Sequence, residues 1–181
     1  MLCYCGSQER FSHCCQPYIT GDEKVESAHL LMRSRFSAYA SKNGSYLYNT
    51  YAKKTQQLQS ETEIQQWANE CEWLALVIHD FDEFNVDFSA YYLHNNRLCH
   101  LREISRFIYE VTEFETKVDL KLKPVSNSNA FGFEQWAYLD GEITEHEELK
   151  TIKRNDICPC NQFKTRWKTK INKKYKQCCG K

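Results

Sequence analysis

The hydrophobic pattern of the chain starts as a helical one. Between residues 25 and 40, apolar side chains recur at steps of three and four, which is typical of a helix with one buried face. Asp22 is placed to cap this helix, and Asn43-Gly44 is expected to end it. The preceding residues 16–21 contain Pro and Gly and are expected to form a turn-rich link.

Two further helices are predicted after that break. Residues 46–51 indicate a short one. Ser60 and Glu63 form a capping box that starts another, whose inward positions fall within residues 64–71. The helical part of the chain is therefore expected to end near residue 71.

From Trp73 onward the period of the pattern changes to two residues. Alternating apolar and polar residues predict strands, most strictly between residues 84 and 90. Asn95-Asn96 is expected to form a hairpin turn, and Asp140-Gly141 to end the sheet. The expected strands cover residues 73–78, 84–90, 97–109 and 133–138. Helices followed by antiparallel strands predict an α+β domain.

Most of the ten cysteines fall into two similar groups near the ends of the chain. Each group joins a C-x-C pair to a vicinal pair: Cys3, Cys5, Cys14 and Cys15 in the first, and Cys158, Cys160, Cys178 and Cys179 in the second. Four thiolates can surround one tetrahedral zinc ion at about 2.3 Å. Iron suits the same donors, and disulfides are a further alternative. Because the start of the chain does not read as a secretory signal, we favour two zinc sites, with iron as the competing metal.

The second cysteine group resembles a known metal-binding module. Cys158-Pro159-Cys160 and the run from Lys174 to Gly180 resemble the SEC-C motif, which is also found at the tail of the SecA translocation ATPase. That motif normally has eight residues between its cysteine pairs. The N-terminal copy keeps eight and the C-terminal copy has seventeen, so residues 163–173 are expected to be an insertion. The expected domains are a module at 1–20, a middle domain at 21–149 and a module at 150–181.

Charge is distributed unevenly along the chain. The formal net charge is zero, yet residues 150–181 carry eleven Lys or Arg against the single acid Asp156, a balance of +10 that leaves −10 for the rest. Some of this charge would offset the thiolates of a metal site. The remainder is either a solvated loop or a contact surface for a ribosome, a nucleic acid or a protein. The candidate contact residues are Lys164, Arg166, Trp167, Lys168 and Lys170.

Composition favours a compact globular protein, because 41% of the residues are hydrophobic, which is enough for a single core. No run of about eighteen apolar residues is present, so no membrane span is expected. The first five residues do not read as a signal peptide. We therefore expect a cytoplasmic protein whose thiols stay reduced.

The middle of the chain resembles a second family. The stretch from Leu31 to Tyr39, with Glu103, Ser105 and the later Trp136-Ala137-Tyr138, closely resembles the YchJ-like family of bacterial proteins. That family combines a domain like nuclear transport factor two (NTF2-like) with SEC-C modules. The resemblance implies a cone in which helices close a curved antiparallel sheet around a pocket, and a homodimer through the outer face of the sheet. One residue departs from the family, which usually has His where this chain has Arg102.

The resemblance also points to residues for the pocket. Glu103 and Ser105 lie two apart on one strand and therefore share a face. If that face is concave, Glu103 could act as a general base, and Arg33 or Arg35 could orient an anion. The alternative, which we favour, is that Glu103 pairs with an arginine of the first helix and holds helix and sheet together.

Two functions are consistent with these residues. The first is a non-enzymatic binding protein that docks onto a macromolecule through its SEC-C modules and basic tail. The second is an enzyme or small-ligand binder that uses the cone pocket. The chain shows no nucleophile with a matched base, no phosphate loop and no open three-ligand metal site. We therefore favour the first function.

Overall fold

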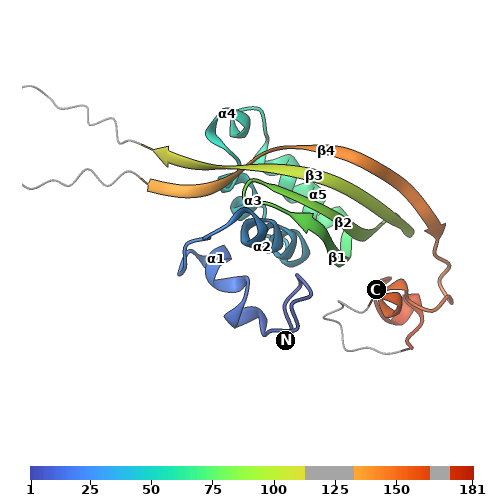
Figure 1. The fold of residues 1–181 in the computed structure, drawn as a ribbon. Helices are drawn as coiled ribbons and strands as arrows, with labels where there is room; N and C mark the ends of the chain where they lie inside the picture. Colours follow the sequence, from blue (N-terminus) through green and yellow to red (C-terminus); the bar gives the residue numbers. More distant parts are fainter. Residues whose placement is uncertain (113–132, 164–171) are drawn as a thin grey trace, which may run out of the picture.

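The computed structural model describes residues 1–112, 133–163 and 172–181 (Figure 1). Its centre is a four-stranded antiparallel sheet in which the strands follow chain order, β1-β2-β3-β4. The strands are β1 (Glu72–Phe81), β2 (Asn85–His94), β3 (Arg97–Thr112) and β4 (Phe133–Thr151). Helices and a sheet in this order confirm the predicted α+β fold.

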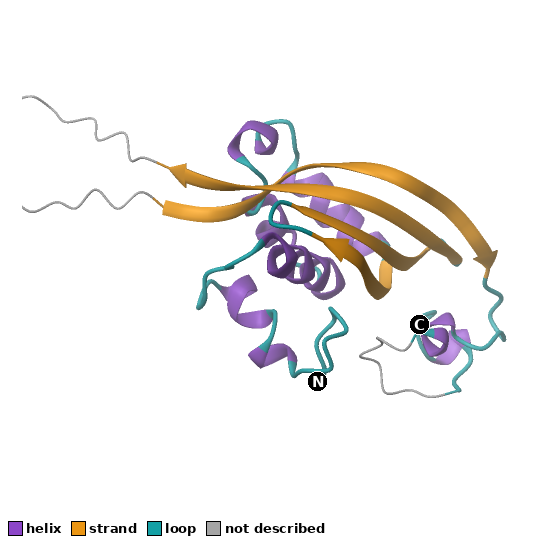
Figure 2. Cartoon of the chain, viewed as in Figure 1, coloured by secondary structure: helices purple, strands orange, loops and turns teal. Residues whose placement is uncertain are grey.

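Five α-helices precede the sheet and three short 3-10 helices lie in the terminal modules of the described chain. The α-helices are α1 (Gln16–Thr20), α2 (Ala28–Ser41), α3 (Gly44–Asn49), α4 (Lys53–Gln56) and α5 (Glu61–Glu70). The 3-10 helices are η1 (Phe11–His13), η2 (Pro159–Gln162) and η3 (Tyr175–Gln177). Figures 1 and 2 show α1, α2 and α3 below the curved sheet, whereas α4 lies above β3 and β4 in this view. Among the described residues, no helix has the length and apolar character needed to span a lipid bilayer.

The predicted start of the first long helix is wrong. Helix α2 begins at Ala28 because the side chain of Ser27 accepts a hydrogen bond from the backbone N–H of Leu30 at 3.2 Å. The carboxylate of Asp22 instead accepts a hydrogen bond from Thr20 at 2.6 Å. The expected turn-rich link is also partly helical, since α1 starts with Pro17 in its first turn, where proline is favourable.

The remaining helical predictions are confirmed. Asn43 ends the region of α2 and caps α3 by accepting a hydrogen bond from Tyr46 N at 2.9 Å. Ser60 caps α5 through the backbone N–H of Glu63 at 3.3 Å. The hairpin between β2 and β3 turns at Asn95-Asn96, where both residues have positive φ as in a type I′ turn.

Asp140-Gly141 does not end the sheet, contrary to the prediction. Strand β4 runs through it to Thr151, and Gly141 pairs with Ser105 of β3. A Cβ built on Gly141 would collide with the carboxylate of Glu103. The glycine is therefore needed for the close approach of Glu103 to β4 rather than for a turn. Register shifts on both sides of this pair bend the β3–β4 ladder, as β-bulges do.

Two hydrophobic clusters connect the modules to the middle domain. The main core joins α2 and the concave face of the sheet, and it also contains Cys3, Cys5 and Cys15. A second cluster joins Cys158, Cys160 and Tyr175 to the ends of β1, β2 and β3, through residues Leu74, Leu93 and Leu98. In Figure 1 the N-terminal module (blue) lies next to α1 and α2, whereas the C-terminal module (red) lies beyond the end of β4.

Candidate metal centres and central cavity

The two cysteine modules are built alike. In each, the residue before the C-x-C pair forms an antiparallel bridge with a later residue, Leu2 with Arg10 and Ile157 with Lys174. A 3-10 helix then leads directly into the vicinal pair. The first cysteine of that pair has φ −131° in both modules. The same backbone path therefore brings each vicinal pair back to its C-x-C pair.

The four sulfur atoms of each quartet converge. In both quartets all four lie within 4.8 Å of one another. Neighbouring sulfurs are 3.7 and 3.9 Å apart in the N-terminal quartet, and 3.5, 3.5 and 3.9 Å apart in the C-terminal one. Zinc–sulfur bonds of about 2.3 Å give a tetrahedron with edges of about 3.8 Å. All ten cysteines are free thiols, and these separations far exceed a disulfide bond of about 2.05 Å. The donor set and its spacing therefore fit one tetrahedral metal ion per quartet.

Helix α2 packs against the N-terminal quartet and places two polar side chains, Arg33 and Ser37, next to its sulfur atoms. Arg33 Nη2 donates to Cys5 Sγ at 3.3 Å. The Ser7 hydroxyl lies 3.3 Å from Cys14 Sγ, and the Ser37 hydroxyl lies 3.7 Å from Cys3 Sγ. A guanidinium and hydroxyls at these positions stabilise negative charge on sulfur. Arg33, a predicted pocket residue, thus lies at the N-terminal cysteine quartet and not among the residues that line the cavity described below.

The C-terminal quartet is held to the sheet by two aromatic residues. Tyr175 donates a 2.7 Å hydrogen bond from its hydroxyl to Asn96 Oδ1 in the β2–β3 turn. Phe163 packs on Tyr91 of β2, with ring centroids 4.7 Å apart. Cys158 and Cys160 are buried, whereas Cys178 and Cys179 are partly exposed. This module is therefore anchored at a few points rather than embedded in the main core.

The thiols titrate differently within the quartets when no metal is bound. Hydrogen bonds from Cys15 and Cys3, helped by the charge of Arg33, lower the pKa of Cys5. Burial raises the pKa of Cys14 to about 11, and burial also raises the pKa of Cys158 to about 11. Because metal binds the thiolate, loading of either quartet near neutral pH must displace protons.

The residues predicted to contact a macromolecule cannot be placed relative to these sites. Lys164, Arg166, Trp167, Lys168 and Lys170 all lie outside the described residues. The described part of the C-terminal module nevertheless carries exposed cations. They are Lys150, Lys153, Arg154, Lys173, Lys174, Lys176 and Lys181.

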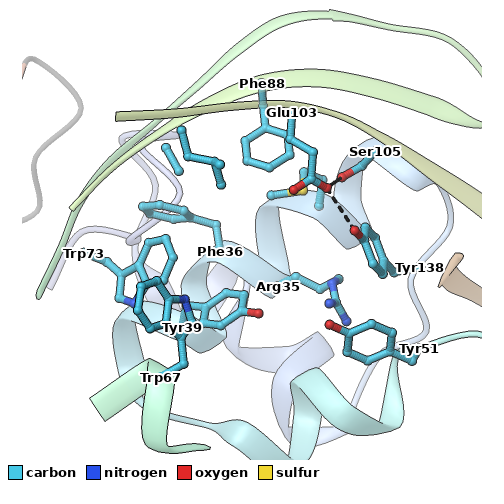
Figure 3. A pocket seen from close by; sticks show the side chains of 13 residues that line it. Arg35, Phe36, Tyr39, Tyr51, Trp67, Trp73, Phe88, Glu103, Ser105 and Tyr138 are labelled. Atoms are coloured by element: carbon cyan, nitrogen blue, oxygen red, sulfur yellow. Dashed lines mark hydrogen bonds between the residues drawn. The ribbon is translucent and has the colours of Figure 1, made fainter. Parts of the chain in front are cut away.

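A cavity of about 210 Å³ lies between α2 and the concave face of the sheet (Figure 3). Arg35, Glu103 and Ser105, three of the four predicted pocket residues, line it. Sequence reasoning missed most of its walls, which are aromatic. These are Phe36, Tyr39, Tyr51, Trp67, Trp73, Phe88 and Tyr138.

Arg35 is fixed at one end of the cavity. Its Nη1 donates to the backbone oxygen of Leu47 at 2.8 Å and to Thr50 Oγ1 at 2.6 Å. Its guanidinium carbon lies 4.6 Å from the ring centroids of both Tyr51 and Tyr138. Such cation–π contacts stabilise a buried positive charge. The guanidinium is therefore rigidly positioned while three of its five N–H groups have no hydrogen-bond partner among the described residues.

Glu103 lies on β3 across the cavity from Arg35. Its Oε1 accepts hydrogen bonds from Ser105 Oγ at 2.6 Å and from Tyr138 Oη at 3.0 Å. Burial and the charge of Glu103 raise the pKa of Tyr138, which keeps that hydroxyl a donor. The ion pairs of the described residues include none between Glu103 and an arginine. The favoured alternative, in which such a pair locks the helix to the sheet, is wrong.

One buried polar atom at the cavity has no partner. Trp73 is 5% exposed and lines the cavity, and its Nε1 is the only fully buried side-chain nitrogen or oxygen without a hydrogen bond in the described chain. Buried donors are normally paired with protein or with a bound molecule. The cavity itself presents two charged groups that do not pair with each other, Arg35 and Glu103.

The outer face of the sheet carries polar side chains that are hydrogen-bonded to one another. Arg102 forms hydrogen bonds of 3.0 and 2.8 Å to the carboxylate of Asp87. The departure from the family pattern at Arg102 therefore leaves the cavity unchanged, because neighbouring strand residues face opposite sides. His100 is buried and shares the hydroxyl of Ser89 with His79, at 2.9 and 2.8 Å.

This fold and its two cysteine quartets define an NTF2-like α+β domain flanked by SEC-C-type modules. The family model for the middle NTF2-like domain of YchJ matches residues 27–115. A UPF0225 protein of Serratia proteamaculans (strain 568) is 31% identical over 188 residues, which cover 99% of this chain and 98% of that protein. A UPF0225 protein of Enterobacter sp. (strain 638) is 30% identical over 185 residues, covering 99% and 97%. The chain belongs to this YchJ, or UPF0225, family.

Two solved structures share the fold. A SEC-C motif containing protein from Psychrobacter arcticus is 23% identical with a TM-score of 0.59, covering 99% of this chain and 96% of that one. RPA3114, a SEC-C motif containing protein from Rhodopseudomonas palustris, is 23% identical with a TM-score of 0.60, covering 80% and 100%. At this identity the likeness extends to the fold alone.

Proposed function

We propose that the protein binds one zinc ion in each cysteine quartet, in a reducing cytoplasmic environment that keeps the thiols available. The observation that supports this most strongly is the convergence of four sulfur atoms within 4.8 Å in both modules. Each quartet supplies all four ligands of a tetrahedral ion and leaves no open position, which is typical of a structural site. Iron is the alternative that the same donors allow.

Metal analysis tests this proposal. Protein purified anaerobically should contain two zinc equivalents per chain, and Cys5→Ser and Cys160→Ser should each contain one. Cobalt substitution should give the absorption typical of four thiolate ligands at both sites. Iron in place of zinc would change the metal and keep the sites. Metal-free wild-type protein with reduced thiols would contradict the proposal.

We further propose that the C-terminal module docks onto an anionic macromolecule, with RNA as the first partner to test. The chain concentrates a balance of +10 in residues 150–181. The exposed cations Lys173, Lys174 and Lys176 take part in none of the ion pairs of the described chain. Uncompensated cations close together in one segment favour phosphate contacts.

The docking proposal predicts salt-sensitive binding. The metal-loaded protein should bind single-stranded RNA at low salt and release it at high salt. Replacing Lys173, Lys174 and Lys176 together with Gln should weaken binding strongly. The same change at Lys24, Lys53 and Lys54, which are exposed elsewhere, should have little effect. Equal binding by both triple variants would contradict docking through this module, and binding only to an acidic protein would change the partner class.

The cavity supports a second candidate function, the binding of a small molecule. Glu103 and Arg35 line the cavity without pairing with each other, and each keeps polar atoms without a partner in the described chain. Leaving such groups without partners is unfavourable, so a bound molecule that contacts them would stabilise the domain. A saturating ligand should therefore raise the thermal midpoint and change the fluorescence of Trp67 and Trp73.

A further inference from the structure

The two charged groups of the cavity each keep an unused hydrogen-bonding edge. Glu103 Oε1 accepts two hydrogen bonds, whereas its Oε2 has no partner among the described residues. Arg35 uses both N–H groups of Nη1, which leaves its Nε and Nη2 groups. Figure 3 shows the Glu103 carboxylate and the Arg35 guanidinium extending from the sheet and from α2 on opposite sides of the cavity. The cavity therefore offers a negative acceptor on one side and positive donors on the other.

The charge balance of the cavity restricts its ligand. Arg35 and Glu103 are the only residues with formally charged side chains among those that line it. A singly charged ligand would compensate one of them and leave the other without a partner of opposite sign. A ligand that carries both charges compensates both. The gain is largest at Arg35, which is 4% exposed, whereas Glu103 is only partly buried.

Size and wall chemistry restrict the ligand further. The cavity volume of about 210 Å³ is below the range of about 300–1,000 Å³ that is typical of sites for drug-sized molecules. Phe36, Trp73 and Phe88 provide apolar wall surface to one side of the two charged groups (Figure 3). A compact molecule with an apolar body and polar groups at one end fits this arrangement.

The unused edges of the two charged groups set the sign of each ligand group. The remaining N–H groups of Arg35 require an acceptor, such as a carboxylate oxygen. The Oε2 atom of Glu103 is an acceptor that an ammonium group satisfies. This matches a ligand with an anionic carboxylate and one cationic ammonium.

We propose that the cavity binds a small zwitterion of the α-amino-acid class with an apolar side chain, whose ammonium contacts Glu103 and whose carboxylate contacts Arg35. The proposal rests on the small-molecule function above and names its ligand class. The Tyr138 hydroxyl holds Glu103 in place, and its ring covers one face of Arg35. One tyrosine therefore positions both charge-recognition groups.

Matched ligands provide the test. The metal-loaded full-length protein is titrated with L-phenylalanine, phenethylamine and 3-phenylpropionate, and with the corresponding sets built on leucine and methionine. Binding is followed by calorimetry and by fluorescence of Trp67 and Trp73. We expect at least one amino acid to bind about tenfold or more tightly than both its amine and its acid, since tenfold corresponds to about 1.4 kcal/mol.

The variant Glu103→Gln sharpens the test. Glutamine keeps an Oε1 acceptor for Ser105 and Tyr138 but removes the charge that would meet the ammonium. It should weaken the amino acid about tenfold or more and leave 3-phenylpropionate within about twofold. The exposed Glu83→Gln is the matched control and should change neither. If Glu103→Gln fails to fold, the ranking of ligands on the wild-type protein decides alone.

Two results would overturn the proposal in different ways. If an amine or an acid binds as tightly as its amino acid, the ligand class is wrong and the small-molecule function stands. If no member of any set binds the folded, metal-loaded protein at millimolar concentration, both the class and the small-molecule function are wrong. In neither case are the metal sites affected, because their test is the metal content.

Discussion

The N-terminal quartet lies inside the main core, whereas the C-terminal quartet packs against the ends of three strands. Cys3, Cys5 and Cys15 share one hydrophobic cluster with Phe36 and the concave face of the sheet. Cys158 and Cys160 belong to a separate cluster. The two modules have the same local backbone, so the difference comes from tertiary context. The same motif can thus complete a core at one end of a chain and form a surface attachment at the other.

The surroundings of the sulfur atoms differ as well. Arg33 donates to Cys5 Sγ at 3.3 Å, and hydroxyls lie near two other N-terminal sulfurs. No arginine is hydrogen-bonded to Cys158, Cys160 or Cys178 in the described chain, where the side-chain contacts of their sulfur atoms run between the cysteines. Hydrogen bonds to charged groups contribute about 1.5–3 kcal/mol. We therefore expect the N-terminal site to hold its metal longer.

The largest effect should come from removing one ligand at each site. Cys5→Ser should lower the free energy of unfolding of the middle domain by about 3 kcal/mol or more, because the metal and a core contact are lost together. Cys160→Ser should lower it by less than about 1 kcal/mol. Urea unfolding followed by circular dichroism measures both. Equal losses would show that the two sites contribute alike to the domain.

A change in the sheet should affect one metal site and not the other. Gly141→Ala places a Cβ against the Glu103 carboxylate and should lower stability by about 1–3 kcal/mol. Since the N-terminal quartet shares the main core, its metal should dissociate faster in this variant. The neighbouring exposed Glu142→Ala is the control. Faster release from the C-terminal quartet instead would contradict the separation of the two clusters.

Arg33→Met should reduce the difference in metal-release rate between the two quartets. Loss of the hydrogen bond to Cys5 Sγ should speed metal release from the N-terminal quartet about tenfold, while the aliphatic part of the side chain is retained. Release is measured with a chromogenic chelator in a Cys160→Ser background, which isolates the N-terminal site. Arg10→Met, an exposed change in the same module, should leave the rate unchanged. An unaltered rate in Arg33→Met would mean that the guanidinium does not stabilise the site.

The smallest effect should come from the anchor of the C-terminal module. Tyr175→Phe removes the 2.7 Å hydrogen bond to Asn96 and should weaken module attachment by about 1 kcal/mol. Limited trypsin digestion should cut the module several times faster, with the thermal midpoint of the middle domain unchanged. Tyr109→Phe, which removes an exposed 3.1 Å hydrogen bond to Glu134, is the control. A lower midpoint in Tyr175→Phe would show that the attachment is part of the domain core.

The fold was predictable where the signal is local. Alternation predicted the strands, and Asn43 and Ser60 were recognisable as helix boundaries. The start of α2 was missed because Asp22 and Ser27 are both good caps and tertiary packing decides between them. The role of Gly141 was missed because Asp-Gly is usually a turn signal, and the carboxylate that needs the space lies on another strand.

The two kinds of candidate site also differ in how far the local sequence predicts them. The cysteine quartets could be predicted because each joins a C-x-C pair to a vicinal pair, a signal that can be recognised locally in the sequence. The cavity could be predicted only in part, since its aromatic walls come from separate elements of the fold. Arg33 and Arg35 could not both have faced it, because residues two apart on a helix point in nearly opposite directions. Helical geometry could therefore have shown that only one of them lines the cavity.

Stepwise metal loss is the most direct test of the contrast between the two quartets. Native mass spectrometry of anaerobically purified protein, sampled during treatment with a chelator, counts the ions bound to each molecule. Two ions should be present at the start, and a one-metal species should accumulate that releases its ion at the rate seen in Cys160→Ser. Simultaneous loss of both ions, or a one-metal species that behaves like Cys5→Ser, would contradict the account.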